Sequence, residues 1–157
     1  MDALILAAGR GQRLGLRGTQ GPKCLLRLGG RTLLARHLDA LVSCGVQRAR
    51  IVVGYRADDI RAEISALAPP IPVDFVLNEE FLRGPVVSLH VGLQASATDQ
   101  DLLIMDADVL YPQELLARLV DSSHLPCLLL DATSTQTGEE MMVGVRAGGA
   151  RCFVRTI

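Results

Sequence analysis

Short apolar runs alternate with longer amphipathic stretches from the start of the chain to about residue 120. The run 3–7 is bounded by glycine, which is typical of a strand buried on both faces of a parallel sheet. The stretch 32–44 (TLLARHLDALVSC) repeats its leucines at helical spacing and is followed by Gly45, a common helix stop. The pattern predicts strands at 3–7, 50–53, 73–77 and 102–105, and helices at 32–44, 58–66, 85–94 and 112–120.

The hydrophobic pattern changes after residue 125, where apolar runs follow one another without an amphipathic stretch between them. We expect strands at 126–130, 141–145 and 152–154. The alternating part predicts an α/β fold with a doubly wound, mostly parallel sheet and helices on both faces, and the last runs predict antiparallel strands. A length of 157 residues, 49% of them hydrophobic, fits a single domain spanning 1–157.

Composition excludes several classes of protein. The net charge of -1 carries no basic surplus of the kind that predicts a nucleic-acid partner. The four cysteines form no CxxC pair, which argues against a zinc or redox motif and fits reduced thiols in the cytoplasm. The N-terminus places Asp2 where a signal peptide needs positive charge, and no apolar run is long enough to span a bilayer. We therefore expect a cytoplasmic protein with no membrane partner.

The first predicted strand ends in a loop with glycines at 9, 11 and 15 and two arginines interleaved between them. This spacing is one residue too long for the dinucleotide fingerprint, and no acidic residue ends the second predicted strand. The Walker pattern fails as well, because Pro22 precedes Lys23 and Cys24 follows it. The loop is left with backbone N–H groups and the cations Arg10, Arg13 and Lys23, which form either a triphosphate cradle or a plain turn with solvated side chains.

A pair of carboxylates ends the fourth predicted strand. Asp106 and Asp108 stand two residues apart in LLIMDADVLYPQELL, so strand alternation points both side chains the same way. Paired oxygen ligands suit Mg²⁺, although one aspartate can instead cap the following helix or close a turn. Because the carboxyl ends of parallel strands share one edge of the sheet, the glycine loop and these carboxylates are expected to face one nucleoside triphosphate.

Two motifs at a fixed separation carry a family resemblance. The segments LILAAGRGQRLG and PKCLLRLGGRTLL resemble the start of the nucleotidyltransferases that activate sugar phosphates and phospho-alcohols. The likeness continues through IVVGYRADDI, VLNEEF, VVSLHVGL and LLIMDADVLYPQELL, and so covers nearly the whole chain. It implies the fold of the nucleotide-diphospho-sugar transferases. It also implies transfer of a nucleoside monophosphate from a nucleoside triphosphate, with CTP favoured, to a small phosphorylated acceptor with release of pyrophosphate.

The resemblance also assigns roles to residues. The segment Ala7, Ala8, Gly9, Arg10 and Gly11 would wrap the nucleotide, Arg13 and Lys23 would contact its phosphates, and Asp108 would carry Mg²⁺ with Asp106 beside it. Asn78, after the third predicted strand, is a further candidate for the nucleotide-binding side. The segment TGEEMMVGVRAGGARCFVRTI is similar to the acceptor side of phosphocholine and related cytidylyltransferases, which makes Glu140 and Arg155 secondary candidates.

Two departures from the family pattern keep alternatives open. The chain has no tryptophan and few other aromatic residues, which weakens phosphocholine as the acceptor because choline needs an aromatic cage. Relatives usually run well beyond 157 residues and supply a second metal-binding aspartate from their C-terminal part, so a truncated form is one expectation. The alternatives are a molybdopterin guanylyltransferase-like enzyme and a nucleotide-binding module without catalysis. His37 is interpreted as a core histidine, and the sequence predicts no oligomeric state.

Overall fold

The computed structural model describes residues 1–10, 21–96, 100–110, 112–123, 126–131, 133 and 142–154. The chain divides into two compact units, Met1–Leu125 and Pro126–Ile157. The strands and helices predicted before residue 125 all form, and their ends agree with the predictions to within one residue. The strands are β1 (Asp2–Leu6), β4 (Ala49–Val53), β5 (Val73–Leu77) and β6 (Leu102–Asp106), and the helices are α1 (Leu33–Ser43), α2 (Ala57–Leu67), α3 (Pro85–Ala95) and α4 (Gln113–Val120).

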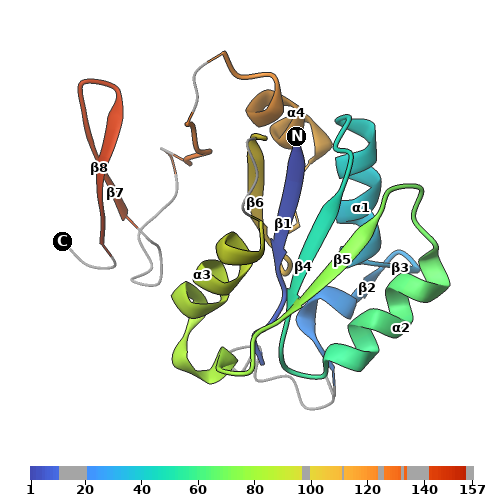
Figure 1. The fold of residues 1–157 in the computed structure, drawn as a ribbon. Helices are drawn as coiled ribbons and strands as arrows, with labels where there is room; N and C mark the ends of the chain where they lie inside the picture. Colours follow the sequence, from blue (N-terminus) through green and yellow to red (C-terminus); the bar gives the residue numbers. More distant parts are fainter. Residues whose placement is uncertain are drawn as a thin grey trace. The chain divides into compact units, whose positions relative to one another are not determined.

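The first unit is built on a parallel sheet with strand order β5-β4-β1-β6 (Figure 1). β1 lies between β4 and β6, and Ala3 is paired with Ala49 on one side and Leu103 on the other. The chain runs from β1 through β4 to β5 and then returns to place β6 on the other side of β1. The strand order therefore reverses between β1 and β6, which is where α/β sheets of this kind form a binding crevice.

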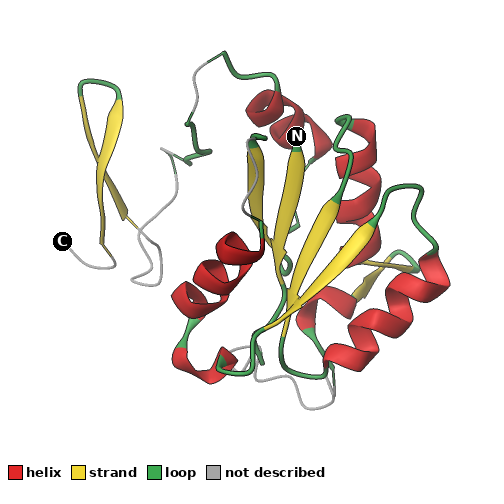
Figure 2. Ribbon diagram, in the orientation of Figure 1, coloured by secondary structure: helices red, strands yellow, loops and turns green. Residues whose placement is uncertain are grey.

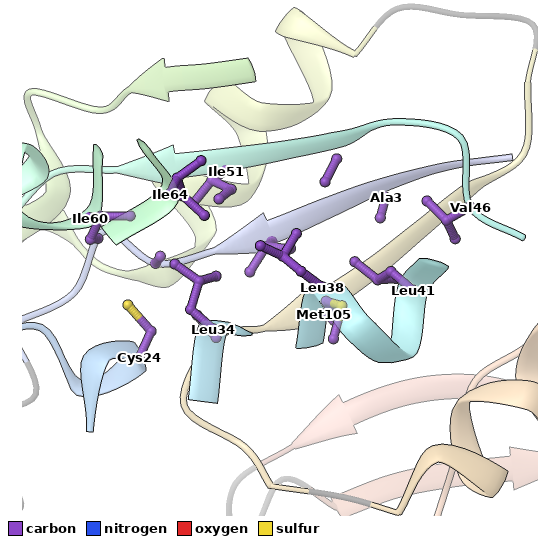
Figure 3. Close-up of a cluster of buried hydrophobic side chains, with 14 of the residues drawn as sticks. Ala3, Cys24, Leu34, Leu38, Leu41, Val46, Ile51, Ile60, Ile64 and Met105 are labelled. Carbon is purple, nitrogen blue, oxygen red and sulfur yellow. The ribbon is translucent and has the colours of Figure 1, made fainter. Parts of the chain in front are cut away.

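The two faces of this sheet are covered differently. Alternate side chains of β1, such as Ala3 and Ile5, pack with α1, α2 and α4 into the main apolar core (Figure 3). We call this side the α1 face. Among the described helices, α3 covers the opposite side, the α3 face, where it packs against β1, β4 and β5 (Figure 1). Leu4, Ala8 and Val52 form the smaller buried cluster there.

Several short elements were not predicted. A 3-10 turn, η2 (Lys23–Leu25), and the small hairpin of β2 (Arg27–Leu28) and β3 (Arg31–Thr32) join the glycine loop to α1, and a second 3-10 turn, η3 (Phe81–Arg83), precedes α3. Such turns have too few residues to show a hydrophobic period, so the sequence pattern does not reveal them. No helix within the described ranges is long and apolar enough to cross a membrane.

The second unit contains an antiparallel hairpin of β7 (Met142–Arg146) and β8 (Gly149–Val154) (Figure 2). Its two-residue loop, Ala147 and Gly148, has the positive φ angles of 50° and 76° that a tight hairpin turn of the primed type requires. The two predicted late strands are thereby confirmed, as is the mostly parallel sheet with late antiparallel strands.

The strand expected at 126–130 is wrong, because these residues have no regular secondary structure. The side chains of Leu128, Leu129 and Leu130 are between 43% and 51% exposed. A strand needs a partner for its backbone N–H and C=O groups, and an apolar run alone does not supply one. In the described part of the second unit, β7 pairs with β8 instead.

Candidate functional site

A cavity of about 660 Å³ opens at the carboxyl ends of β1 and β6. Its walls come from the residues that follow β1, from η2, from η3 and the first turn of α3, and from the end of β6. This is the place where the strand order reverses. The size is in the range of cavities that hold small ligands, and the lining contains both cationic and carboxylate side chains.

The chain leaves β1 through a buried turn. Ala7 and Ala8 are 7% and 2% exposed, and their backbones stay attached to the neighbouring strand. The Ala7 N–H donates to the Val52 carbonyl at 2.9 Å, and the Ala8 carbonyl accepts from the Tyr55 N–H at 3.0 Å. Ala7, Ala8, Gly9 and Arg10, which the family resemblance assigns to the nucleotide, all line the cavity. The predicted residues Gly11 and Arg13 lie outside the described residues, as do Glu140 and Arg155.

Aromatic rings hold the Arg10 side chain. Its guanidinium carbon lies 5.8 Å from the centres of both the Tyr55 and the Phe81 rings, within the range of cation–π attraction. Phe81 in turn packs on Gly54, where a Cβ atom would lie 2.8 Å from the Phe81 Cβ and Cγ atoms. Glycine at position 54 therefore allows Phe81 to approach β4 and to form one wall of the cavity beside Arg10.

The predicted cation Lys23 and the predicted carboxylate Asp108 form an ion pair on the wall of this cavity. Lys23 Nζ donates to Asp108 Oδ2 at 3.0 Å, and the two side chains are 26% and 41% exposed. The residues are 85 positions apart in the sequence. They come together because η2 and the end of β6 both lie at the carboxyl edge of the sheet. The contact places one positive and one negative side chain where they can face a phosphate chain and its metal ion.

Asp106 adds a second carboxylate to the same edge of the sheet. Burial raises the pKa of its carboxyl group above the ordinary value, and the neighbouring charge of Asp108 raises it further. Both aspartates line the cavity. A cation near this pair would offset the repulsion between the carboxylates.

The donor set suits Mg²⁺ bound together with a nucleotide. Mg²⁺ usually takes one or two carboxylates and completes its shell with phosphate oxygens and water. The described residues contain no cluster of three or more metal-ligating side chains. Asp106 and Asp108 therefore fit a metal ion that arrives with phosphate groups.

The structure places Asn78 behind the cavity wall. Its side chain is 1% exposed, its Nδ2 donates to Ser88 Oγ at 2.9 Å, and its Oδ1 accepts from the Glu80 N–H at 3.0 Å. Ser88 lines the cavity, and Asn78 holds the connection between β5 and α3 in place. The sequence pattern predicted that Asn78 follows a strand. It did not predict that the Asn78 side chain is buried and hydrogen-bonded to Ser88 and Glu80.

Other residues near the cavity were not assigned to the site from sequence. Phe81 and Ser88 line it, and His37, which was interpreted as a core histidine, donates to a carbonyl next to Asp108. Cys24 also lines the cavity, but its thiol is buried, and burial raises its pKa to about 12, so it stays protonated. No local motif distinguishes these residues, because their positions depend on contacts between segments far apart in the chain.

Comparison with known proteins gives consistent matches. Residues 3–152 match the family described as MobA-like NTP transferase domain. The chain is 32% identical over 118 residues to the CMP-5'-(3-aminopropyl)phosphonate synthase of Streptomyces rubellomurinus, covering 74% of this chain and 18% of that protein. It is 26% identical over 136 residues to the CTP:phosphoglutamine cytidylyltransferase of Campylobacter jejuni, covering 83% of this chain and 53% of that protein.

A solved structure shares the fold. The structure of a nucleotidyl transferase from Methanothermobacter thermautotroptrophicus matches with a TM-score of 0.62 and 29% sequence identity, covering 76% of this chain and 56% of that one. The chain thus spans about half or less of the length of these relatives. The match confirms the expected fold of the nucleotide-diphospho-sugar transferases. Since the family match extends over residues 3–152, and so over nearly the whole sequence, the chain belongs to the MobA-like NTP transferase domain family.

Proposed function

We propose that this chain binds a nucleoside triphosphate with Mg²⁺ and transfers its nucleoside monophosphate to a small phosphorylated acceptor, releasing pyrophosphate. The observation that carries this proposal is the 3.0 Å pairing of Lys23 with Asp108 on the wall of the cavity between β1 and β6. A cation for phosphate and a carboxylate for metal stand side by side there, in a domain whose relatives are nucleotidyltransferases.

The reaction requires positioning and charge neutralisation more than covalent chemistry by the protein. An oxygen of the acceptor phosphate attacks the α-phosphorus of the nucleotide in line, the bond to the β-phosphate breaks, and pyrophosphate leaves. Lys23 and Arg13 offset the negative charge on the phosphate chain, and Arg10 adds a cation held by its aromatic neighbours. Asp108 and Asp106 would hold Mg²⁺, which when bound neutralises charge on the phosphate oxygens.

We further propose CTP as the nucleotide, since the two relatives described above carry CMP or CTP in their names. Their names also describe phosphonate or phosphate acceptors, which fits a sugar phosphate or a phospho-alcohol here. Phosphocholine is a weaker candidate because Tyr55 and Phe81, the aromatic residues beside the described cavity, already face the Arg10 guanidinium. Nucleoside triphosphates are cytoplasmic metabolites, so the proposed reaction takes place in the cytoplasm.

The test measures pyrophosphate release with each of CTP, GTP, UTP and ATP in the presence of Mg²⁺ against a panel of sugar phosphates, phospho-alcohols and a pterin acceptor. Nucleotide binding is followed in parallel by calorimetry. Release with one pairing identifies the substrates, and release with GTP and a pterin acceptor selects the guanylyltransferase alternative. Binding without release from any pairing identifies a nucleotide-binding module, and the absence of both overturns the proposed site.

The Asp108→Asn variant tests the metal role. Loss of this carboxylate is expected to lower turnover by roughly 10²-fold or more, the size of effect seen when one charge-stabilising group is removed from an active site. The matched control is Asp101→Asn, which makes the same change just before β6, at the far end of the strand from the cavity. Equal turnover in the Asp108→Asn and Asp101→Asn variants would contradict the assignment.

A further inference from the structure

The helix α1 holds the segment that carries Lys23. The N–H of Leu33, the first residue of α1, donates to the Leu26 carbonyl at 3.1 Å, and the Leu26 N–H donates to the Lys23 carbonyl at 3.0 Å. Thr32 caps the helix, because its hydroxyl oxygen accepts from the Ala35 N–H at 3.1 Å. The backbone of η2 is therefore attached to the start of α1 by an unbroken chain of hydrogen bonds.

One turn further along, the same helix contacts the segment that carries Asp108. His37 is 3% exposed, and its Nε2 lies 2.7 Å from the Val109 carbonyl oxygen. A carbonyl oxygen only accepts, so Nε2 carries the proton in this contact. Burial lowers the pKa of His37, so at neutral pH the ring is neutral and carries its one proton on Nε2.

The backbone around Asp108 is attached on both sides. On the N-terminal side, the Ala107 N–H donates to the Leu6 carbonyl of β1 at 3.1 Å. On the C-terminal side, Val109 is held by His37 through its carbonyl, while its own side chain is 43% exposed and packs little. Asp108 sits between these two attachments, and its exposed carboxylate reaches Lys23.

We propose that His37 is a positioning residue for Asp108. Its bond to the Val109 carbonyl sets the path of the backbone after β6, so that the Asp108 carboxylate faces Lys23 and the cavity. α1 then holds both members of the charged pair, Lys23 through its first turn and Asp108 through His37. The part of this inference that concerns Mg²⁺ rests on the proposed function, but the positioning itself belongs to the metal-free chain.

Three variants separate positioning from packing. His37→Leu fills much of the space but has no donor for the Val109 carbonyl. His37→Gln restores an N–H at a similar distance from the backbone and is expected to rescue the contact. Leu38→Ala removes a neighbouring α1 side chain that is also 3% exposed but belongs to the apolar core, so it measures the effect of destabilisation alone.

The first readout needs no metal. Backbone order parameters of Asp108 and Val109 are measured by ¹⁵N relaxation on the full metal-free chain. We expect rigid values of about 0.85 for the unmodified chain, His37→Gln and Leu38→Ala, and values below about 0.6 for His37→Leu. Unchanged order parameters in His37→Leu, or an equal drop in Leu38→Ala, would overturn the proposal.

The second readout is the affinity for Mn²⁺, measured by electron paramagnetic resonance with a non-hydrolysable nucleotide present. His37→Leu is expected to bind Mn²⁺ roughly 10- to 100-fold more weakly, the range seen when a residue that orients a metal ligand is lost. His37→Gln and Leu38→Ala should stay near the unmodified value. If Asp108→Asn binds Mn²⁺ as tightly as the unmodified chain, the proposed metal role fails, and the order parameters alone decide the role of His37. If Asp108→Asn weakens binding but His37→Leu does not, the positioning inference fails while the proposed metal role stands.

Discussion

The two faces of the central sheet differ most plainly within one strand. On β6, Leu103 and Met105 point to the α1 face and are 6% and 7% exposed, while Ile104 between them points to the α3 face and is 44% exposed. The α1 face is covered by α1, α2 and α4, and the described α3 face is covered by α3. Among the described residues of Met1–Leu125, the same strand therefore has a closely packed side and a thinly covered side.

The two faces of the sheet contribute different parts of the cavity. The α1 face supplies a fixed base, and α1 attaches to it both the turn with Lys23 and, through His37, the segment with Asp108. The α3 face supplies the opposite wall of the cavity through Phe81, Ser88 and the first turn of α3. Lys23 and Asp108, to which the proposed function assigns phosphate and metal, are thus attached to the better-packed side. The opposite wall of the cavity lies on the side with less buried surface.

Neighbouring residues on β6 test this comparison with the largest expected effect. Leu103→Ala removes a buried side chain from the α1 face and is expected to lower the free energy of unfolding by about 2–5 kcal/mol. Ile104→Ala removes a half-exposed side chain from the α3 face and should cost about 1 kcal/mol or less. Urea denaturation followed by circular dichroism measures both. Equal losses at the two positions would show that the α3 face is as well packed as the α1 face.

A glycine on α3 gives a second test. A Cβ atom at Gly92 would lie 2.8 Å from Val52 Cγ2 and 2.9 Å from both Leu4 Cδ atoms, and these side chains are fully buried. Gly92→Ala is therefore expected to destabilise the protein by about 1–3 kcal/mol, although alanine normally favours a helix. Gly21→Ala, at a position with no atom within 4 Å of a Cβ, is the control that should change little.

The result at Gly92 shows how firmly α3 is attached to the sheet. Destabilisation would show that α3 is held by close contact at a few points, with Gly92 against Val52 and Leu4. A neutral or stabilising change, measured by the same urea denaturation, would show that α3 can move away from the sheet. The wall of the cavity would then be adjustable rather than fixed.

The elements of the first unit could be predicted from sequence because each carries its own signal. Leucines in the stretch 32–44 repeat at helical spacing, and Gly54 and Pro72 border two of the apolar strands, so local patterning and tertiary packing agree. The run 126–130 shows the limit of this reasoning. Its residues are apolar, but strand pairing depends on a neighbour that local sequence does not specify.

Some residues of the candidate site could likewise be predicted from sequence, and others could not. Lys23, Asp106 and Asp108 could be placed together because the carboxyl ends of parallel strands meet at one edge, and the structure brings Lys23 and Asp108 to 3.0 Å. The contact between His37 and Val109 joins residues 72 positions apart through a backbone carbonyl, which leaves no trace in the spacing of side chains. A buried histidine among leucines looks the same in sequence whether or not it holds a neighbouring segment.

The smallest expected effect concerns pH and returns to His37 on the α1 face. Burial lowers its pKa in the folded chain below the ordinary value of 6.5, so below pH 6.5 the unfolded chain binds more protons at this residue than the folded chain does. The stability that depends on neutral His37 is therefore fully present above pH 6.5 and is lost as pH falls through the lowered pKa. His37→Gln removes this dependence. The amount by which the Tm of the unmodified chain exceeds the Tm of His37→Gln should therefore decrease as pH falls from about 7.5 to about 5.5. Taking the difference cancels the titration of Asp106, which both proteins share. His90→Gln, at an exposed position on α3, is the matched control. A Tm difference between the unmodified chain and His37→Gln that stays constant across this pH range would show that His37 is not buried in solution.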